Sequence, residues 1–426
     1  MTEGAGSRLP LLAVVYGPLA HEQPIDRITE AARGVCRLLW LLPHDDRSAR
    51  TALRVRKAEG GVTGDVIDVS DIPIGEAAAL IRSHRPDGVT CFTDENIVWT
   101  SELAEELGLA YHSRRSAVQL TDKLEQRRAF AARGLPTPAF WNGDDLADDS
   151  APARIAEAAG FPLVLKPRGG FGSVDTESIR SVDELRAAAA GLVRGRMILE
   201  GYIPDPTNSP FGAGSAPYAC VDMVASGGVV EVLGMTGRTP LAPPFRETGS
   251  FFPADVPEAI RAQLIDAAVD AVRALGVDLG VLRVEVKWTD AGPVVIEVNG
   301  RPDGGHTREF LRHALGVDTF QVAMRAALGE PVAREGRPAT QGVHFRFDLI
   351  PEMHLRRISS VEGLEAARAM AGVEEVIPGL AIGDEFSWRD GSFALVATVL
   401  GSAPDHESVH RLRAAVDAAV VVTGTP

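Results

Sequence analysis

Two adjacent strands that carry carboxylates constrain this chain more than any other feature. The stretch from Gly280 to His306 reads GVLRVEVKWTDAGPVVIEVNGRPDGGH. Apolar and polar residues alternate in both halves, which is the period-2 pattern of half-buried strands. Asp290-Ala291-Gly292 between them predicts a three-residue hairpin loop that pairs Thr289 with Pro293.

Counting back from this loop sets two glutamates against each other. Glu285 falls directly opposite Glu297, with Cβ atoms about 5 Å apart, and Asn299 follows on the same face. Like charges this close destabilise a sheet unless a cation compensates. Mg²⁺, with Mn²⁺ as the alternative ion, fits because it takes oxygen ligands and completes its shell with water and phosphate oxygens. In the simpler interpretation, Arg283 and Lys287 neutralise the pair on a solvated face.

The loop after the second strand favours the metal. It carries one fixed cation, Arg301, and an arginine beside a metal carboxylate suits phosphoryl or acyl-phosphate chemistry. Gly304 and Gly305 would let the backbone approach a ligand closely.

Composition excludes several classes of function. The net charge of −15 over 426 residues argues against a nucleic-acid partner, because phosphate backbones bind basic surfaces. Cys36, Cys91 and Cys220 are scattered and odd in number, which fits a reducing cytoplasm. The sequence has no apolar run of the ~20 residues that a membrane span needs and does not start like a signal peptide. We therefore expect a cytoplasmic protein with no membrane partner.

Strands and helices alternate in the first part of the chain, which predicts a parallel sheet covered by helices. The first strand is followed by GPLAHEQP and not by Gly-x-Gly-x-x-Gly, so a dinucleotide cradle is absent. This region is more suited to binding a substrate. Asp94 and Glu95 follow a strand at its carboxyl end, where open α/β sheets place ligands, and would hold an ammonium group. Alternatively, they only complement a helix dipole.

The middle of the chain carries isolated lysines and a glycine-rich loop. Lys123 lies in the first turn of a predicted helix, where the helix dipole favours acids instead. Lys166 ends an apolar strand and precedes the loop Gly169–Ser173, whose free N–H groups would cover phosphates. It is not a Walker A loop, because the lysine comes before the glycines. Glu200 lies in a later strand, and a turn-rich segment spans 236–252.

Taken in order, these residues resemble the ATP-grasp superfamily of ligases over roughly residues 85 to 330. The whole set of residues in this order is a more specific sign of the superfamily than any one of the residues alone. It comprises Lys123, Lys166 with its glycine loop, Ile198-Leu199-Glu200-Gly201-Tyr202-Ile203, Glu285 and Glu297-x-Asn299-x-Arg301.

The resemblance implies a role for each matching residue. Lys123, Lys166, Gly170 and Ser173 would contact the ATP phosphates. Glu200 would take the adenine amino group, with Tyr202 and Ile203 in the hinge. Glu285, Glu297 and Asn299 would bind Mg²⁺, and Arg301 would stabilise the transferring phosphoryl group. The family's ribose-binding glutamate has no counterpart, because the loop 204–217 intervenes.

Within the superfamily, EVNGRPDGGH and the C-terminal unit are similar to the L-amino-acid ligases. This implies an ATP-dependent ligase that joins two amino acids, or short peptides, through an acyl phosphate. The loop around Gly304 and Gly305 would receive the carboxylate substrate, and Glu95, Arg246 and His306 would read amino-acid groups. The alternatives are ligation of another pair, such as a γ-glutamyl or peptide-tail ligation, and a nucleotide-binding protein without catalysis.

The expected fold is α/β and α+β in four parts. An N-terminal parallel-sheet domain spans 1–120, a small ATP-grasp lobe 121–196, a large lobe with the metal site 197–330, and a small C-terminal α/β domain 331–426. Residues 330–341 have the polar, proline-containing composition of a linker. No chemical motif is present in the C-terminal domain, which we expect either to close the substrate pocket or to form the face of a homodimer.

Overall fold

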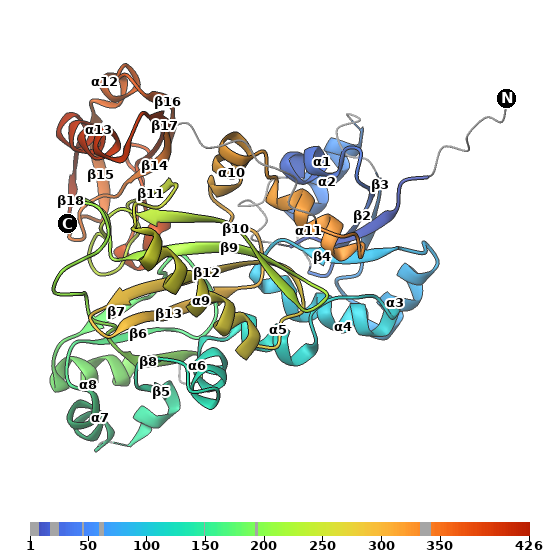
Figure 1. The fold of residues 1–426 in the computed structure, drawn as a ribbon, viewed down its shortest axis with the longest axis horizontal. Coiled ribbons are helices and arrows are strands. Elements are labelled where there is room, and N and C mark those ends of the chain that lie inside the picture. Colours follow the sequence, from blue (N-terminus) through green and yellow to red (C-terminus); the bar gives the residue numbers. More distant parts are fainter. Residues whose placement is uncertain are drawn as a thin grey trace.

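The computed structural model describes residues 8–17, 25–44, 47–58, 64–148, 150–191, 195–332 and 342–426. Most of the predicted linker at 330–341 lies outside these residues. The N-terminal sheet lies at one end of the molecule, and the small lobe and the C-terminal unit lie together at the other end (Figure 1). In the part of the chain that the structure describes, no helix is long and apolar enough to cross a membrane.

The N-terminal sheet is parallel, with strand order β3-β2-β1-β4. Its strands are β1 Leu11–Val15, β2 Arg37–Leu42, β3 Gly64–Asp68 and β4 Gly88–Cys91. Its helices are α1 Ile25–Ala32, α2 Arg47–Ala58, α3 Ile74–Arg82, α4 Ile97–Leu107 and α5 Arg114–Thr121, with a 3₁₀ turn η2 at Asp94–Asn96 between β4 and α4.

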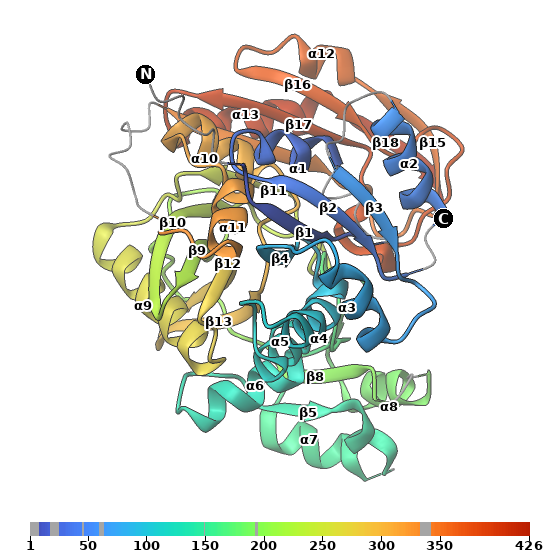
Figure 2. The same ribbon diagram turned by 90° about the vertical axis from the view of Figure 1, so that its right-hand side faces the viewer.

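Both faces of this sheet are buried, because successive residues of a strand point to opposite sides. Leu12 and Val14 of β1 pack in one core with α1 and α2, and with α11 (Thr319–Ala327) from much later in the chain. Ala13 and Val15 pack in the other core with α3, α4 and α5. Figure 2 shows α11 lying against the blue N-terminal sheet. The later part of the chain thus returns to cover the first domain.

The small lobe is a four-stranded antiparallel sheet, order β5-β8-β6-β7, with helices on one side. Its strands are β5 Phe140–Asn142, β6 Leu163–Pro167, β7 Glu177–Ile179 and β8 Met197–Gly201. Its helices are α6 Lys123–Ala132, η3 Gly143–Ala147, α7 Ala151–Ala159 and α8 Val182–Gly191. The carboxylate of Asp122 caps α6 by accepting from the N–H groups of Leu124 and Glu125, which fixes Lys123 at the first helical position.

The large lobe is built on an antiparallel eight-stranded sheet with strand order β13-β12-β9-β10-β11-β14-β17-β16. The first five of these are β9 Tyr218–Ser226, β10 Val229–Arg238, β11 Gly249–Phe252, β12 Leu279–Thr289 and β13 Gly292–Asn299. Helix α9 (Glu258–Ala274) packs its apolar stripe on β9, β12 and β13. Helix α10 (Thr307–Leu315) follows the hairpin.

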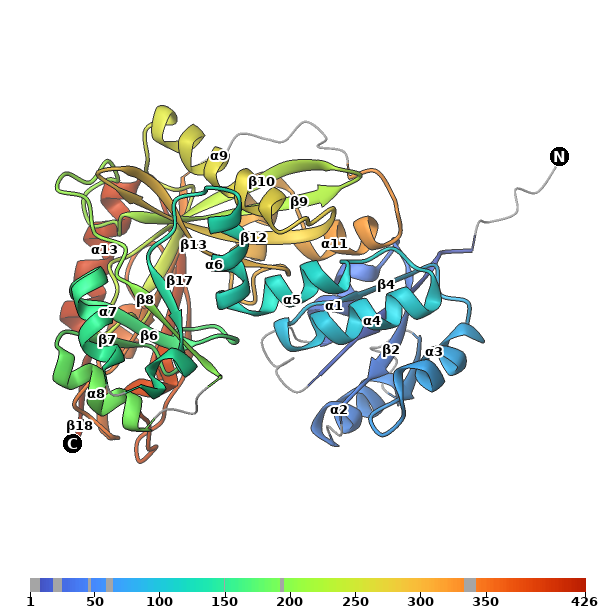
Figure 3. The same ribbon diagram turned by 90° about the horizontal axis from the view of Figure 1, so that it is seen from below.

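The last three strands of this sheet come from the C-terminal unit. They are β14 Val343–Leu349, β16 Val373–Pro378 and β17 Ala397–Ala403, and β14 pairs with β11. The remaining elements are β15 Arg357–Glu362, α12 Leu364–Arg368, η4 Trp388–Phe393, α13 His406–Ala419 and β18 Val421–Thr425. The C-terminal unit therefore extends the large-lobe sheet, and Figure 3 shows it beside the small lobe.

The predicted fold class is confirmed, while several local predictions need correction. The hairpin after β12 has a two-residue loop, Asp290-Ala291, because Thr289 pairs with Gly292 and not with Pro293. A bulge near Ile296 restores the register, so Glu285 still lies opposite Glu297. The sequence patterns did not predict α2, α5, α7, β5, β7, β11, β15, β16 or β18. The domain boundaries at 120, 196 and 330 stay predictions, and β8, just past 196, pairs within the small-lobe sheet.

Candidate functional site

A cavity of about 530 Å³ lies between the small lobe and the large sheet. Every residue that the sequence predicts to contact nucleotide lines it, together with two of the three predicted metal ligands. These residues are Lys123, Lys166, Gly170, Ser173, Glu200, Tyr202, Ile203, Glu285 and Glu297. Residues far apart in the sequence thus converge on one space.

The opposed glutamates form the large-lobe wall of this cavity. Glu285 and Glu297 are cross-strand partners on β12 and β13, and the amide of Asn299 donates to Glu297 Oε1 at 3.3 Å. Burial and the charges of Glu297 and Glu247 raise the pKa of the Glu285 carboxyl from 4.5 to about 7. Burial also opposes ionisation of Glu297, but Lys123 and Lys166 outweigh it and hold the pKa of that carboxyl below its ordinary value.

These residues fit a hard divalent cation, because the raised pKa of Glu285 reports a carboxylate whose charge is not fully compensated. Among the described residues, no group of three or more His, Cys, Asp or Glu side chains is arranged to hold a metal. An ion here would therefore take the two glutamates, with Asn299, water or phosphate oxygens completing its shell.

The simpler interpretation of the hairpin, in which two cations neutralise the glutamates on a wet face, is wrong. Arg283 is buried and pairs with Asp222 at 2.8 Å. Lys287 is also buried and pairs with Asp205 at 2.9 Å. Neither forms an ion pair with the opposed glutamates, because each pairs with a carboxylate of its own; Arg283 acts on Glu285 only through its charge.

Lys123 joins the glycine-rich loop to the metal-side glutamates. Its ammonium group donates to the carbonyl of Gly170 at 2.6 Å and pairs with Glu297 Oε2 at 3.0 Å. The start of α6 points this side chain into the cavity, which explains why a lysine occupies a first-turn position that the helix dipole disfavours.

Lys166 and Glu200 form a buried charge cluster with Arg127, a residue that the sequence analysis did not single out. Lys166 Nζ lies 2.9 Å from Glu200 Oε2, and Arg127 Nε lies 2.8 Å from Oε1. Burial alone would raise the pKa of Glu200, but Arg127 and Lys166 bring it down to about 2. Burial lowers the pKa of Lys166. Arg127 also donates to the carbonyls of Val295 and Ile296, which ties the small lobe to β13.

The glycine-rich loop adopts a left-handed path over the cavity. Gly170, Gly172 and Ser173 have φ of +92°, +69° and +57°. Glycine adopts such angles freely, whereas a serine does so only when its surroundings hold it. Ser173 Oγ donates to the carbonyl of Phe245 at 2.9 Å, which supplies one such restraint.

The hinge carries Tyr202 and Ile203 and is anchored by Lys287. Lys287 Nζ donates to the carbonyl of Ile203 at 2.7 Å and lies 4.3 Å from the centre of the Tyr202 ring. Tyr202 Oη donates to Asp205 at 2.7 Å. The lysine therefore fixes the connection between the lobes and lines the same cavity.

Arg301 lies beside the cavity wall and contacts the N-terminal domain. Its Nε and Nη2 lie 3.0 and 2.9 Å from Asp94 Oδ2, and its guanidinium stacks 5.2 Å from the Phe171 ring of the glycine-rich loop. Asp94 and Glu95 lie in η2, just past the carboxyl end of β4. Asp94 thus pairs with the arginine that the sequence predicts to act on phosphate.

The predicted amino-acid-reading residues lie outside the cavity lining. The Arg246 guanidinium is buried and donates to the carbonyls of Pro243 and Pro351, at 2.8 and 2.9 Å. It therefore anchors the 236–252 segment. Glu95 lies with Asp94 in η2.

Gly304, Gly305 and His306 precede α10, where a Cβ on Gly305 would come within 2.6 Å of Arg346 Nη1. Burial, with the charges of Arg346 and Arg27, lowers the pKa of His306 to about 4. The close approach at Gly305 is thus to a side chain of the C-terminal unit.

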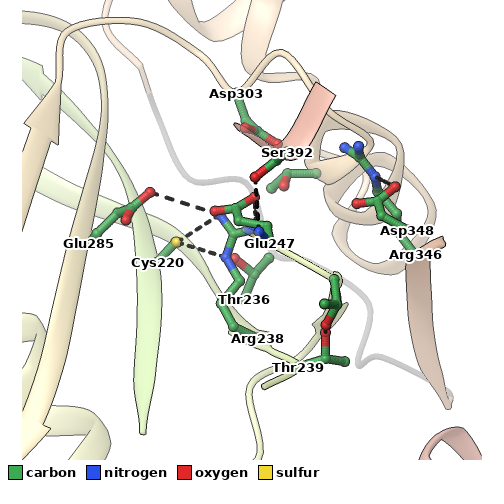
Figure 4. Close-up of polar contacts among 12 residues, drawn as sticks. Cys220, Thr236, Arg238, Thr239, Glu247, Glu285, Asp303, Arg346, Asp348 and Ser392 are labelled. Atoms are coloured by element: carbon green, nitrogen blue, oxygen red, sulfur yellow. Dashed lines mark hydrogen bonds and ion pairs between the residues drawn. The ribbon is translucent and has the colours of Figure 1, made fainter. Parts of the chain in front are cut away.

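A polar relay at the edge of the cavity was also missed from the sequence (Figure 4). Arg238, at the end of β10, donates to Glu247 at 2.9 Å and to Cys220 Sγ at 3.2 Å, and lies 3.9 Å from Glu285. The sequence signal was limited to Arg238, Arg246 and Glu247 within a turn-rich segment. These residues meet their partners only in the folded chain, and no local sequence pattern encodes that pairing.

Comparisons with known proteins agree with this arrangement. Residues 120–305 match the family described as "ATP-grasp domain". The chain is 28% identical over 313 residues to the uncharacterized protein y4rH of Sinorhizobium fredii, covering 72% of this chain and 62% of that protein. It is 30% identical over 281 residues to carnosine synthase 1 of Gallus gallus, covering 61% of this chain and 29% of that protein. The chain thus spans less than two thirds of the length of these relatives.

Among solved structures, the L-amino acid ligase of Bacillus licheniformis shares the fold. The TM-score is 0.71 at 19% sequence identity, covering 98% of this chain and all of that one. At this identity the likeness concerns the fold, including the C-terminal unit that the family match does not reach.

Proposed function

Since residues 120–305 of this chain form an ATP-grasp domain, we propose that the protein is an ATP-dependent ligase that joins the carboxylate of one amino acid to the amine of another. One observation carries this proposal above the rest. Two opposed glutamates, a glycine-rich loop and two lysines line one cavity, Arg301 contacts that loop through Phe171, and each matches a task of phosphoryl transfer.

The first half-reaction transfers a phosphoryl group. A substrate carboxylate oxygen attacks the γ-phosphorus, the bond to the β–γ bridging oxygen breaks, and ADP leaves with that electron pair. Lys123 and Lys166 neutralise the phosphate charge from the small lobe, while the glycine-rich loop excludes water. Mg²⁺ held by Glu285, Glu297 and Asn299 would neutralise charge that develops on the phosphates.

The second half-reaction forms the amide. The amine nitrogen attacks the acyl carbon, the bond from that carbon to the phosphate oxygen breaks, and phosphate leaves as the nitrogen loses a proton. Arg301 lies between Asp94 and the glycine-rich loop, so it can follow the charge from the γ-phosphate to the acyl phosphate.

Three relatives support an amino-acid substrate by their names. Besides the L-amino acid ligase and carnosine synthase, a D-alanine–D-alanine ligase of Bordetella petrii is 31% identical over 189 residues, covering 42% of this chain and 54% of that protein. We propose small amino acids or short peptides as substrates, and ADP and phosphate as products.

The test is a matrix of single and paired amino acids with ATP and Mg²⁺. We expect ADP and phosphate to appear together only with particular pairs, along with a product lighter than the pair by one water in mass spectrometry. ADP release with single amino acids and no condensed product would contradict peptide-bond formation. A condensed product from a γ-carboxylate or a peptide tail would instead identify a different ligation.

A further inference from the structure

One turn of the C-terminal unit lies directly on the glycine-rich loop. We call residues 387–393 the clasp turn; it contains η4, Trp388–Phe393. The N–H of Ser392 donates to the carbonyl of Gly172 at 2.8 Å, and the N–H of Asp175 donates to the carbonyl of Arg389 at 2.9 Å. The Arg389 side chain also pairs with Glu177 at the start of β7. The loop is therefore bound through its backbone on both sides of its tip.

An aromatic contact extends this connection toward the proposed catalytic arginine. The Phe393 ring meets the Phe171 ring edge-on, with centroids 5.7 Å apart. The guanidinium of Arg301 lies 5.2 Å from the centre of that same Phe171 ring. Phe171 thus contacts the clasp turn and Arg301 together, and Phe393 also lines the cavity.

Ser392 also connects the clasp turn to the metal-side glutamates. Its hydroxyl accepts from the N–H of Glu247 at 2.9 Å, and the Glu247 carboxylate accepts from Arg238 at 2.9 Å. Arg238 in turn lies 3.9 Å from Glu285 (Figure 4). Ser392 therefore hydrogen-bonds to the glycine-rich loop through its N–H. Through its hydroxyl it hydrogen-bonds to Glu247, which is linked to Glu285 by Arg238.

The fit between turn and loop is close enough to depend on one glycine. A Cβ on Gly391 would lie 2.1 Å from the carbonyl oxygen of Gly172 and 2.7 Å from the amide nitrogen of Val174. Ser173 of the loop and Asp175 just after it have φ of +57° and +49°. Non-glycine residues keep such angles where surrounding contacts impose them, and the clasp turn supplies several of those contacts.

We propose that the clasp turn positions the glycine-rich loop over the nucleotide phosphates, with Ser392 as the positioning residue that links this loop to the metal-side glutamates. The proposal rests on the proposed function for the identity of the ligand, but the loop's dependence on the turn does not. On this proposal, the C-terminal unit contributes to nucleotide binding although it does not contact the phosphates.

The test compares two glycine-to-alanine variants in the same unit. Gly391→Ala puts a methyl group against the loop, whereas Gly383→Ala adds one with nothing within 4 Å. Both place an alanine at a positive φ, +65° and +93°, and only the first of them meets the loop. The readouts are hydrogen–deuterium exchange of amides 170–177, the affinity for Mg·AMP-PNP, and the thermal unfolding midpoint.

For Gly391→Ala, we expect exchange in amides 170–177 to rise about tenfold and AMP-PNP affinity to fall about fivefold, because the loop opens locally. Its unfolding midpoint should stay near that of Gly383→Ala. Equal exchange in the two variants, with both folded, would overturn the proposal. A Gly391→Ala protein whose amides 170–177 exchange faster but which binds AMP-PNP as tightly as wild type would overturn the proposal as well.

A second pair of variants isolates the hydroxyl without straining the backbone. Ser392→Ala keeps the N–H that bonds Gly172 and loses the acceptor for Glu247. We expect a raised KM for ATP with kcat changed less, and restoration by Ser392→Thr. Unchanged kinetics in Ser392→Ala would overturn the role of Ser392. If wild-type protein forms no amide, the proposed function fails. Hydrogen–deuterium exchange and AMP-PNP binding still test whether the clasp turn positions the glycine-rich loop.

Discussion

Replacing Glu285 by glutamine should stabilise the metal-free protein, and the effect should grow with pH. In the folded protein, burial and two neighbouring carboxylates raise the pKa of Glu285 from 4.5 to about 7. A group whose pKa is higher in the folded state favours folding while it is protonated. That contribution is present at low pH and is lost as the pH rises to and through about 7. Glutamine stays neutral at every pH, so the variant does not lose this contribution to the free energy of unfolding.

The size of the effect follows from the pKa. Each unit of pKa corresponds to about 1.4 kcal/mol. The free energy of unfolding of Glu285→Gln should therefore exceed that of wild type by about 1 kcal/mol at pH 5 and by about 3 kcal/mol at pH 8.5. The Glu285 side chain is only 17% exposed, so solvent screens little of this difference.

Urea unfolding followed by tryptophan fluorescence measures this difference, because Trp288 lies on the same strand as Glu285. The buffers contain EDTA, and the control is Glu375→Gln, at an exposed position of β16. Added Mg²⁺ should reduce the difference, since the ion compensates the charge in wild type. A difference that does not change between pH 5 and pH 8.5 would refute the reasoning that burial and the neighbouring carboxylates raise the pKa of Glu285.

Three further substitutions test individual residues. Glu297→Ala should abolish ADP release while AMP-PNP still binds, since the lysines and hinge remain; unchanged turnover, measured by coupled ADP assay, would remove the metal assignment. Arg301→Lys should lower kcat by about 100-fold with a smaller change in KM for ATP, because a lysine cannot replace a bidentate donor at the developing charge; equal kcat in steady-state kinetics would contradict this. Arg127→Met should destabilise the fold by about 3 kcal/mol, since it leaves Glu200 buried with one partner fewer; a urea midpoint equal to wild type would show that Lys166 alone suffices.

The carboxylate register was predictable from sequence because it depends on the strand period. Glu285 and Glu297 face each other as expected, yet the predicted three-residue loop was wrong. A shorter turn and a bulge near Ile296 compensate for each other, and neither leaves a distinct signal in an apolar run. Lys123, Lys166, Glu200, Glu285 and Glu297 of the family resemblance line one cavity, whereas Asn299 and Arg301 lie outside its lining.

Pairs between residues that are not neighbours in the sequence could not be predicted. Arg301 pairs with Asp94 of the N-terminal domain, Arg127 of α6 with Glu200 of β8, and Arg238 at the end of β10 with Glu247 in the segment that follows. Local patterns describe neighbours along the chain and give no distance between such residues. The C-terminal unit shows the same limit, because it holds no chemical motif and reaches the site through backbone hydrogen bonds of its clasp turn.

The central claim is that a substrate carboxylate attacks the γ-phosphate of ATP, and ¹⁸O transfer measures that step directly. The protein is incubated with ATP, Mg²⁺ and a pool of amino acids labelled with ¹⁸O in their carboxylates, and the released phosphate is weighed by mass spectrometry. The account predicts phosphate carrying one ¹⁸O, released together with ADP, because one carboxylate oxygen leaves with the phosphoryl group. Unlabelled phosphate, or label found in AMP, would contradict it.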